Sequence, residues 1–276
     1  MMPAVTGLLE PFNYEFFRNG MIAAVIVGAI CGYVGVYVVL RRMSYIGHGL
    51  AHALFGGAVL SSIIGLNFFI GAGVWALVNA VVIHLISHRR LVGADAAIGV
   101  VTTTSFALGV AVVSTYRRFT VDFEAALFGN LLGITPADLW VIAVTAAAVA
   151  VAMIVIRRQL LFSTFDPEVA PVYGISTSRT ELVFVLLLAV TIVASTRILG
   201  VTLVSAAVVI PPVIGRYLTQ RFQTLLIITP IIGALCAAAG MYASYFIDLS
   251  SGAMIVLTFA LVFFVVGGRR WLRGNR

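Results

Sequence analysis

Two histidines four residues apart are the side chains of this chain whose type and spacing best suit chemistry. They are His48 and His52, in the stretch LRRMSYIGHGLAHALFGG at residues 40–57. On a helix, residues i and i+4 lie on one face one turn apart, so both imidazoles can bind one divalent metal ion. A zinc-protease interpretation is excluded, because Gly49 stands where that motif needs a glutamate base. The pair therefore predicts a metal site without hydrolytic chemistry.

The elements that must hold this pair are membrane helices. The 276 residues are 62% hydrophobic and only 10% charged, with a mean hydropathy of +1.12, whereas a soluble domain is about a quarter charged. Apolar runs of about twenty residues, the length that crosses a bilayer, recur along the chain. We expect an all-α polytopic membrane protein with one transmembrane domain over residues 1–276. About nine spanning helices (eight to ten) are predicted, at 17–40, 46–66, 68–87, 95–115, 138–156, 180–196, 198–217, 223–246 and 251–268.

The basic residues predict the orientation of these helices. All seventeen are arginine, and the net charge is +7. In so apolar a chain they are interpreted as topogenic charges and lipid contacts, and no nucleic-acid partner is expected. Arginine gathers in cytoplasmic loops. We therefore expect an external N-terminus and a cytoplasmic C-terminus, which leaves outside only Arg18, Arg117, Arg118 and Arg197.

Two connections between the spans carry further candidate residues. The external loop at 116–137 holds an apolar stretch too short to cross the bilayer, and Asp122, Glu124 and Gly129 in it are candidates for an external gate. The bland alternative is that the two acids are solvated loop residues.

The internal connection at 157–179 predicts a two-turn helix that begins at Asp166. Asp166 can cap it, Pro167 suits its first turn, Glu168 favours its positive end and Gly174 can stop it. So short a helix is marginal in water, so it needs its own protein or a soluble partner to pack against.

A double proline in the segment 198–217 predicts a broken or kinked helix. Pro211 and Pro212 together remove two backbone donors. In a membrane such a break is tolerated where it is buried in protein or lines a cavity, so the two prolines are candidate path residues.

The chain resembles the membrane permease subunits of ABC importers for manganese, zinc and iron. Six stretches in the same order carry this resemblance over nearly the whole chain: VVLRRMSYIGHGLAHALFGG (37–57), DAAIGVV…FALGV (95–110), ALFGNLLGITPADLW (126–140), FDPEVAPVYGIS (165–176), LGVTLVSAAVVIPP (199–212) and SYFIDLSSGAMIVL (244–257).

The resemblance implies a multi-pass protein of the cell membrane that is itself no enzyme. Two permease chains would pair as a homodimer and dock two cytoplasmic ATPase subunits, which alone bind ATP. An extracytoplasmic binding protein would deliver the metal ion, zinc, manganese or iron, as cargo, and no cofactor is held permanently. The segment 165–176, which begins at Phe165, resembles the coupling helix that docks on the ATPase.

One position departs from the family pattern. The family usually reads G-D-x-L-x-H at 47–52, with the aspartate and the histidine on the metal path, whereas this chain reads GHGLAH. The resemblance therefore implies a path role for His52, while His48 replaces a carboxylate. Nitrogen ligands suit zinc better than manganese, so zinc is favoured.

Two other functions remain open from the residues alone. A membrane haem or electron-transfer protein would use His48/His52 together with the second i,i+4 pair, His84/His88. An ABC permease for a metal chelate would share the fold and differ in cargo. No nucleophile–base–acid constellation and no phosphate-binding glycine-rich loop is visible, so the chain is not expected to hydrolyse a nucleotide unaided.

Overall fold

A computed structural model describes residues 9–88, 93–115, 129, 133–247 and 249–274, except for the side chains at 88, 94, 273 and 274. All regular structure in these ranges is helical. The predicted all-α class is therefore confirmed for the described part of the chain. The elements are η1 (Glu10–Asn13), α2 (Glu15–Leu40), α3 (Ser44–Ile63), α4 (Phe68–His88), α5 (Ala94–Thr115), α7 (Pro136–Val155), α8 (Arg157–Phe165), η2 (Ala170–Tyr173), α9 (Thr177–Leu218), α10 (Phe222–Ile247) and α11 (Ser251–Gly274).

Eight of the described helices are long and apolar enough to cross a membrane, one fewer than the nine expected and within the predicted range of eight to ten. One of them, α9, covers two of the expected segments, 180–196 and 198–217. It has 42 residues, so as a straight rod it would be about 63 Å long, twice the hydrocarbon thickness of a bilayer. Its backbone leaves helical geometry at Gly200, with φ 74° and ψ 164°. This break divides α9 where the sequence separates the two segments.

The double proline does not break α9, which corrects the sequence-based prediction. Gly200 is the residue of α9 with non-helical angles, and the helix runs on through Pro211 and Pro212. Proline at 212 removes the helical donor for the Val208 carbonyl. Gly35 of α2 lies against this carbonyl so closely that a Cβ at Gly35 would overlap its oxygen. The prolines therefore sit in a packed helix contact.

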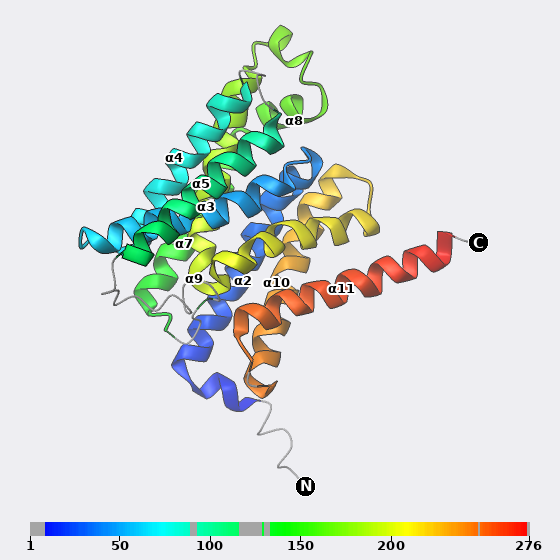
Figure 1. The fold of residues 1–276 in the computed structure, drawn as a ribbon. Helices are drawn as coiled ribbons and strands as arrows, with labels where there is room; N and C mark the ends of the chain where they lie inside the picture. Colours follow the sequence, from blue (N-terminus) through cyan, green and yellow to red (C-terminus); the bar gives the residue numbers. More distant parts are fainter. Residues whose placement is uncertain (1–8, 89–92, 116–128, 130–132, 248, 275–276) are drawn as a thin grey trace. The chain divides into compact units, whose positions relative to one another are not determined.

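The chain divides into two compact units, one of residues 1–36, 124–146 and 195–276, the other of residues 37–123 and 147–194. In the first unit, α2 and α10 touch backbone to backbone. A Cβ at Gly28 would overlap the Gly233 carbonyl, and a Cβ at Gly233 would overlap that of Gly28. The hairpin of α10 and α11, at the orange and red end of Figure 1, is close-packed at Gly240 against Ile255. Such small-residue contacts are how helices associate in lipid.

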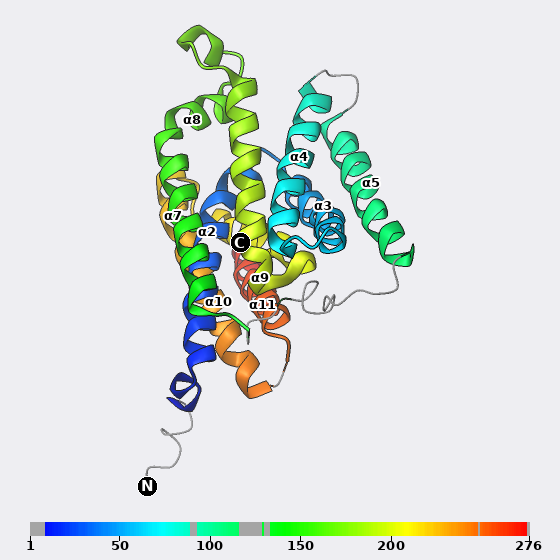
Figure 2. The ribbon, with the colours of Figure 1, turned by 90° about the vertical axis from the view of Figure 1, so that its left-hand side faces the viewer.

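In the second unit, α3 packs against both α4 and α5, which lie side by side in Figure 2. Adjacent glycines of α3 make this contact on two sides. A Cβ at Gly56 would overlap the Ser105 carbonyl of α5, and a Cβ at Gly57 would overlap the Trp75 side chain of α4. The glycines of α3 therefore leave room for two helices, and this packing fixes the rotation of the helix that carries His48 and His52.

Candidate metal site and coupling segment

The two histidines of the predicted pair face one another on α3. Their Nε2 atoms lie 3.1 Å apart and their ring centroids 4.4 Å apart. At this distance one ring nitrogen donates a hydrogen bond to the other, in the direction that their tautomers set. His48 is exposed and His52 is half-buried, so the pair is open to a ligand.

The same distance suits a shared metal ion. Two zinc–nitrogen bonds of about 2.05 Å place the nitrogens about 3.3 Å apart at a tetrahedral angle and about 2.9 Å apart at a right angle. The separation between His48 and His52 lies between these values. The spacing of the two nitrogens would therefore suit one ion, once the rings turn from their mutual hydrogen bond so that both lone pairs point at it. The metal role of the pair stays a prediction.

Aromatic side chains of α3 and α5 hold the rings of the pair. His52 meets Phe106 edge to face with centroids 5.8 Å apart, and Phe106 in turn lies 5.3 Å from Phe55. Tyr45 lies 6.3 Å from the His48 ring. These contacts limit the rotation of His52 more than that of His48, which has an exposed side chain.

A polar network that the sequence did not predict lies next to the pair. Trp75 Nε1 of α4 donates to Ser105 Oγ of α5, and Ser105 Oγ donates to the Ala53 carbonyl of α3 at 3.0 Å. Asn79 Nδ2 also reaches Ser105 Oγ, at 3.4 Å. The only signal in the sequence is a serine and an asparagine inside apolar runs, which does not reveal that they meet. The network ties three helices together at the residue after His52.

The pair lacks further ligands within the described ranges. No third histidine, cysteine, aspartate or glutamate joins it there, whereas a tetrahedral site needs four donors. The acids proposed for an external gate, Asp122 and Glu124, lie outside the described residues.

The second histidine pair is held differently. His84 is buried in α4, and its Nε2 lies 3.2 Å from Ser178 Oγ of α9. The side chain of His88 lies outside the described ones. An imidazole nitrogen engaged by a serine is not presented to a haem iron, so the geometry of His84 does not favour the haem interpretation.

The segment 165–176 does not form the predicted two-turn helix. Phe165 ends α8, where the Asp166 amide donates to the Phe162 carbonyl, and the Asp166 carbonyl in turn accepts from the Val169 and Ala170 amides, so Asp166 closes α8 and also begins the next turn. Pro167 and Glu168 follow in a turn, and only the four-residue 3-10 helix η2 is formed. The stop at Gly174 is confirmed, since it adopts φ 71°, the left-handed conformation that glycine favours.

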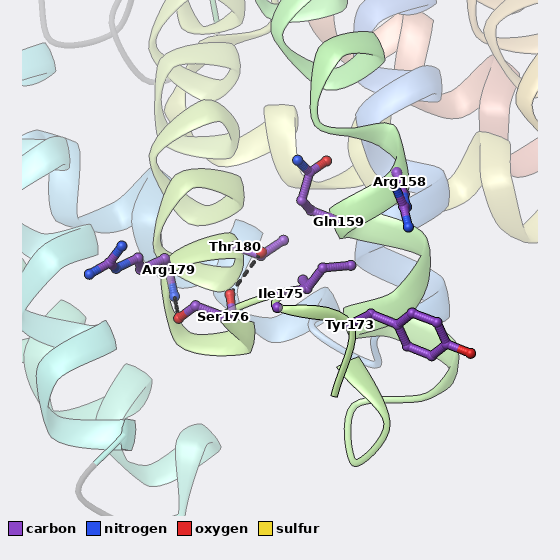
Figure 3. A pocket seen from close by; sticks show the side chains of 8 residues that line it. Arg158, Gln159, Tyr173, Ile175, Ser176, Arg179 and Thr180 are labelled. Carbon is purple, nitrogen blue, oxygen red and sulfur yellow. Dashed lines mark hydrogen bonds between the residues drawn. The ribbon is translucent and has the colours of Figure 1, made fainter. Parts of the chain in front are cut away.

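The segment 165–176, the candidate coupling segment, exposes apolar side chains. Val172 is 83% exposed, Phe165 52% and Tyr173 58%, so three apolar side chains close together in the chain are open to contact. A cavity of about 400 Å³ lies beside them, with Arg158 and Arg179 among its lining residues. In Figure 3 the two guanidinium groups lie on opposite sides of this pocket. The positive charges do not converge, so the apolar residues are the more distinctive feature of this surface.

Gly129, the third gate candidate, lies at the break in α9. It has φ 82°, and a Cβ there would overlap the Ile198 carbonyl and approach the Gly200 amide. One turn earlier, Arg197 forms an ion pair with Asp138 of α7. Arg197, interpreted from the sequence as a topogenic charge, thus also joins α9 to α7. The gate role of Gly129 stays a prediction.

Comparison with known proteins identifies relatives along almost the whole chain. The model of the ABC 3 transport family matches residues 13–268. The manganese transport system membrane protein MntC of Halalkalibacterium halodurans is 37% identical, over 96% of this chain and 93% of that protein. The chelated iron transport system membrane protein YfeC of Yersinia pestis is 34% identical, over 93% and 87%. The solved structure of PsaBC from Streptococcus pneumoniae in complex with Fab has a TM-score of 0.84 and 28% identity, and covers 95% of each chain.

Proposed function

Because this chain belongs to the ABC 3 transport family and is a multi-pass permease of the cell membrane, we propose that it forms the membrane path of an importer for a divalent transition-metal ion. The observation that carries this proposal is the pair of Nε2 atoms 3.1 Å apart on α3. The printed names of the relatives point to manganese or iron as cargo. A pair of imidazole nitrogens can bind manganese, iron or zinc. Because imidazole suits zinc and iron better than manganese, the pair favours these two metals.

The energy for transport comes from a separate ATPase subunit in this proposal. The exposed apolar residues Phe165, Val172 and Tyr173 supply a surface that a soluble partner can cover. Two permease chains and two ATPase subunits would form the complex, with an external protein that delivers the metal. In a two-fold dimer, His48 and His52 of both chains would supply four nitrogens, which completes a tetrahedral shell.

A change at His48 tests the choice of metal. In His48→Asp, a carboxylate replaces one nitrogen ligand, and carboxylates suit manganese better than imidazole does. We expect the ratio of manganese to zinc uptake to rise by about tenfold or more, which corresponds to about 1.4 kcal/mol of relative affinity. Uptake of zinc, manganese and iron by the complex reconstituted in vesicles measures this ratio. Ser62→Ala, on the same helix and bonded within the described residues only to the Ala58 carbonyl of that helix, is the control and should leave the ratio unchanged. An unaltered ratio in His48→Asp would contradict the ligand assignment.

Charge reversal in the coupling segment tests the docking surface. Asp166 and Glu168 are exposed beside the apolar residues. Replacing both by lysine should weaken association with the ATPase about 3- to 10-fold, because each reversed charge at the edge of an interface alters the affinity modestly. Co-purification of the ATPase at increasing salt measures the effect. Glu10→Lys, an exposed residue of η1 with the same kind of charge change, should have no effect. Equal recovery of the ATPase with both variants would remove the coupling role of this segment.

A further inference from the structure

Arg41 is a second feature of the coupling region, and it is not explained by topogenic charge. It follows α2 and reaches across to the end of α8. Its Nε donates to Thr164 Oγ1 at 2.9 Å, and its Nη2 donates to Ser163 Oγ at 2.5 Å and to the Leu160 carbonyl at 3.4 Å. The guanidinium thus binds the last turn of α8, where a positive charge is favoured by the helix dipole.

The same side chain also contacts α9. Its guanidinium carbon lies 4.9 Å from the centre of the Phe184 ring, a cation–π distance. Burial lowers the pKa of Arg41 from its ordinary value, and the negative charge of Glu181 acts in the opposite direction. The guanidinium therefore gives up part of its hydration for fixed partners on two helices, in a geometry that an ammonium group cannot reproduce.

The neighbouring Arg42 differs from Arg41 in its exposure and its contacts. Arg42 is exposed, while Arg41 is partly buried and makes three hydrogen bonds to α8. Both residues carry the same charge at the same place in the chain. They form a natural matched pair, in which only Arg41 connects separate helices.

Arg41 lies between the two functional segments of its unit. On one side, the residues that it binds immediately precede the coupling segment, which begins at Phe165. On the other side, a tight turn leads from Arg41 into α3, with the Met43 amide donating to the Val38 carbonyl and the Ile46 amide to the Met43 carbonyl. His48 follows in the second turn of α3. The end of α8 is therefore linked, through the hydrogen-bonded guanidinium of Arg41 and the turn at Met43, to the start of the helix that carries the histidine pair.

We propose that Arg41 is a positioning residue that couples movement of the coupling segment to α3. This inference rests on the proposed function, because it needs an ATPase that displaces the segment and a metal that α3 handles. The guanidinium of Arg41, held by three hydrogen bonds to α8, transmits displacement because the end of α8 and the start of α3 cannot then shift independently. Loss of the fork leaves both segments folded and loosens the link between them.

The test compares Arg41→Gln with Arg42→Gln in the complete transporter, reconstituted in vesicles, with metal uptake and ATP hydrolysis measured in the same sample. The ratio of metal ions imported to ATP hydrolysed should fall about 3- to 30-fold in Arg41→Gln, with the ATPase still bound and active. Arg42→Gln should keep the wild-type ratio. Arg41→Lys, which keeps the charge without the fork, should lie between them.

A second variant covers the case that Arg41→Gln does not fold. Ser163→Ala combined with Thr164→Val removes two acceptors of Arg41 and should lower the same ratio. If Arg41 only stabilised the fold, its loss would reduce metal uptake and ATP hydrolysis in proportion. The inference is overturned if the ratio of metal imported to ATP hydrolysed is unchanged in both the Arg41 and the Ser163/Thr164 variants. Wild-type complex that hydrolyses ATP but imports no metal would overturn the proposed function itself, so the two failures are distinct.

Discussion

Replacement of His52 by alanine is expected to abolish metal uptake, with a loss of at least about 100-fold. Loss of His52 leaves each chain with His48 as its one donor of the pair, and even residues that only support a ligand change metal affinity by about 10- to 100-fold. His52 is half-buried and contacts Phe106 through its ring, so the fold should tolerate alanine. The measurement is uptake of zinc, manganese and iron by the reconstituted complex, with the ATPase retained.

Two controls separate the chemistry of His52 from its packing. His52→Gln keeps a polar side chain of similar size without an imidazole nitrogen, so it should be as defective as His52→Ala. The melting temperature of the purified permease should stay within a few degrees of wild type in both. Normal uptake of every metal by His52→Ala would mean that the path does not use this residue.

The largest effect on stability is expected at the crossing of α2 and α10. In Gly28→Ala the new Cβ would overlap the Gly233 carbonyl and lie 2.8 Å from the Ala237 Cβ. Both obstacles are backbone or short side chain, so the helices must separate, at about 1–3 kcal/mol. We expect the melting temperature in detergent to fall by about 5 °C or more.

Gly268→Ala is the matched control for this prediction. Gly268 lies in α11, and a Cβ there would meet no atom within 4 Å. Alanine is the better helix former by about 1 kcal/mol, so this variant should be as stable as wild type or slightly more so. Equal melting temperatures for the two alanine variants would show that α2 and α10 accommodate a Cβ at Gly28 without loss of stability, which would contradict the prediction.

The spanning helices could be predicted from the sequence because lipid imposes a simple rule. Backbone groups in hydrocarbon must bond within their own helix, so each apolar run of sufficient length becomes a helix, and the described helices agree with the expected segments within a few residues. The break in α9 followed no such rule. Among 26 glycines, nothing in the sequence distinguishes Gly200, whereas the prolines that looked decisive are tolerated where α2 packs against them.

The candidate site was predictable only in part. The i,i+4 spacing placed His48 and His52 on one face, because helix geometry alone decides it. Asp166 does begin a turn, since its carbonyl accepts from the Val169 and Ala170 amides, but this turn leads only into the four-residue helix η2 and not into the expected two-turn helix. The roles of Ser105 and Arg41 depend on contacts between residues far apart in the chain, which local patterns do not contain.

The close packing of α3 has a mechanical consequence. Gly56 and Gly57 lie directly against the backbone at Ser105 and Gly71 and against the start of the Trp75 side chain, and close-packed interiors resist continuous deformation. Sliding of α3 past α4 or α5 would drive backbone into backbone. We therefore expect α3, α4 and α5 to move together as one body in any change of conformation.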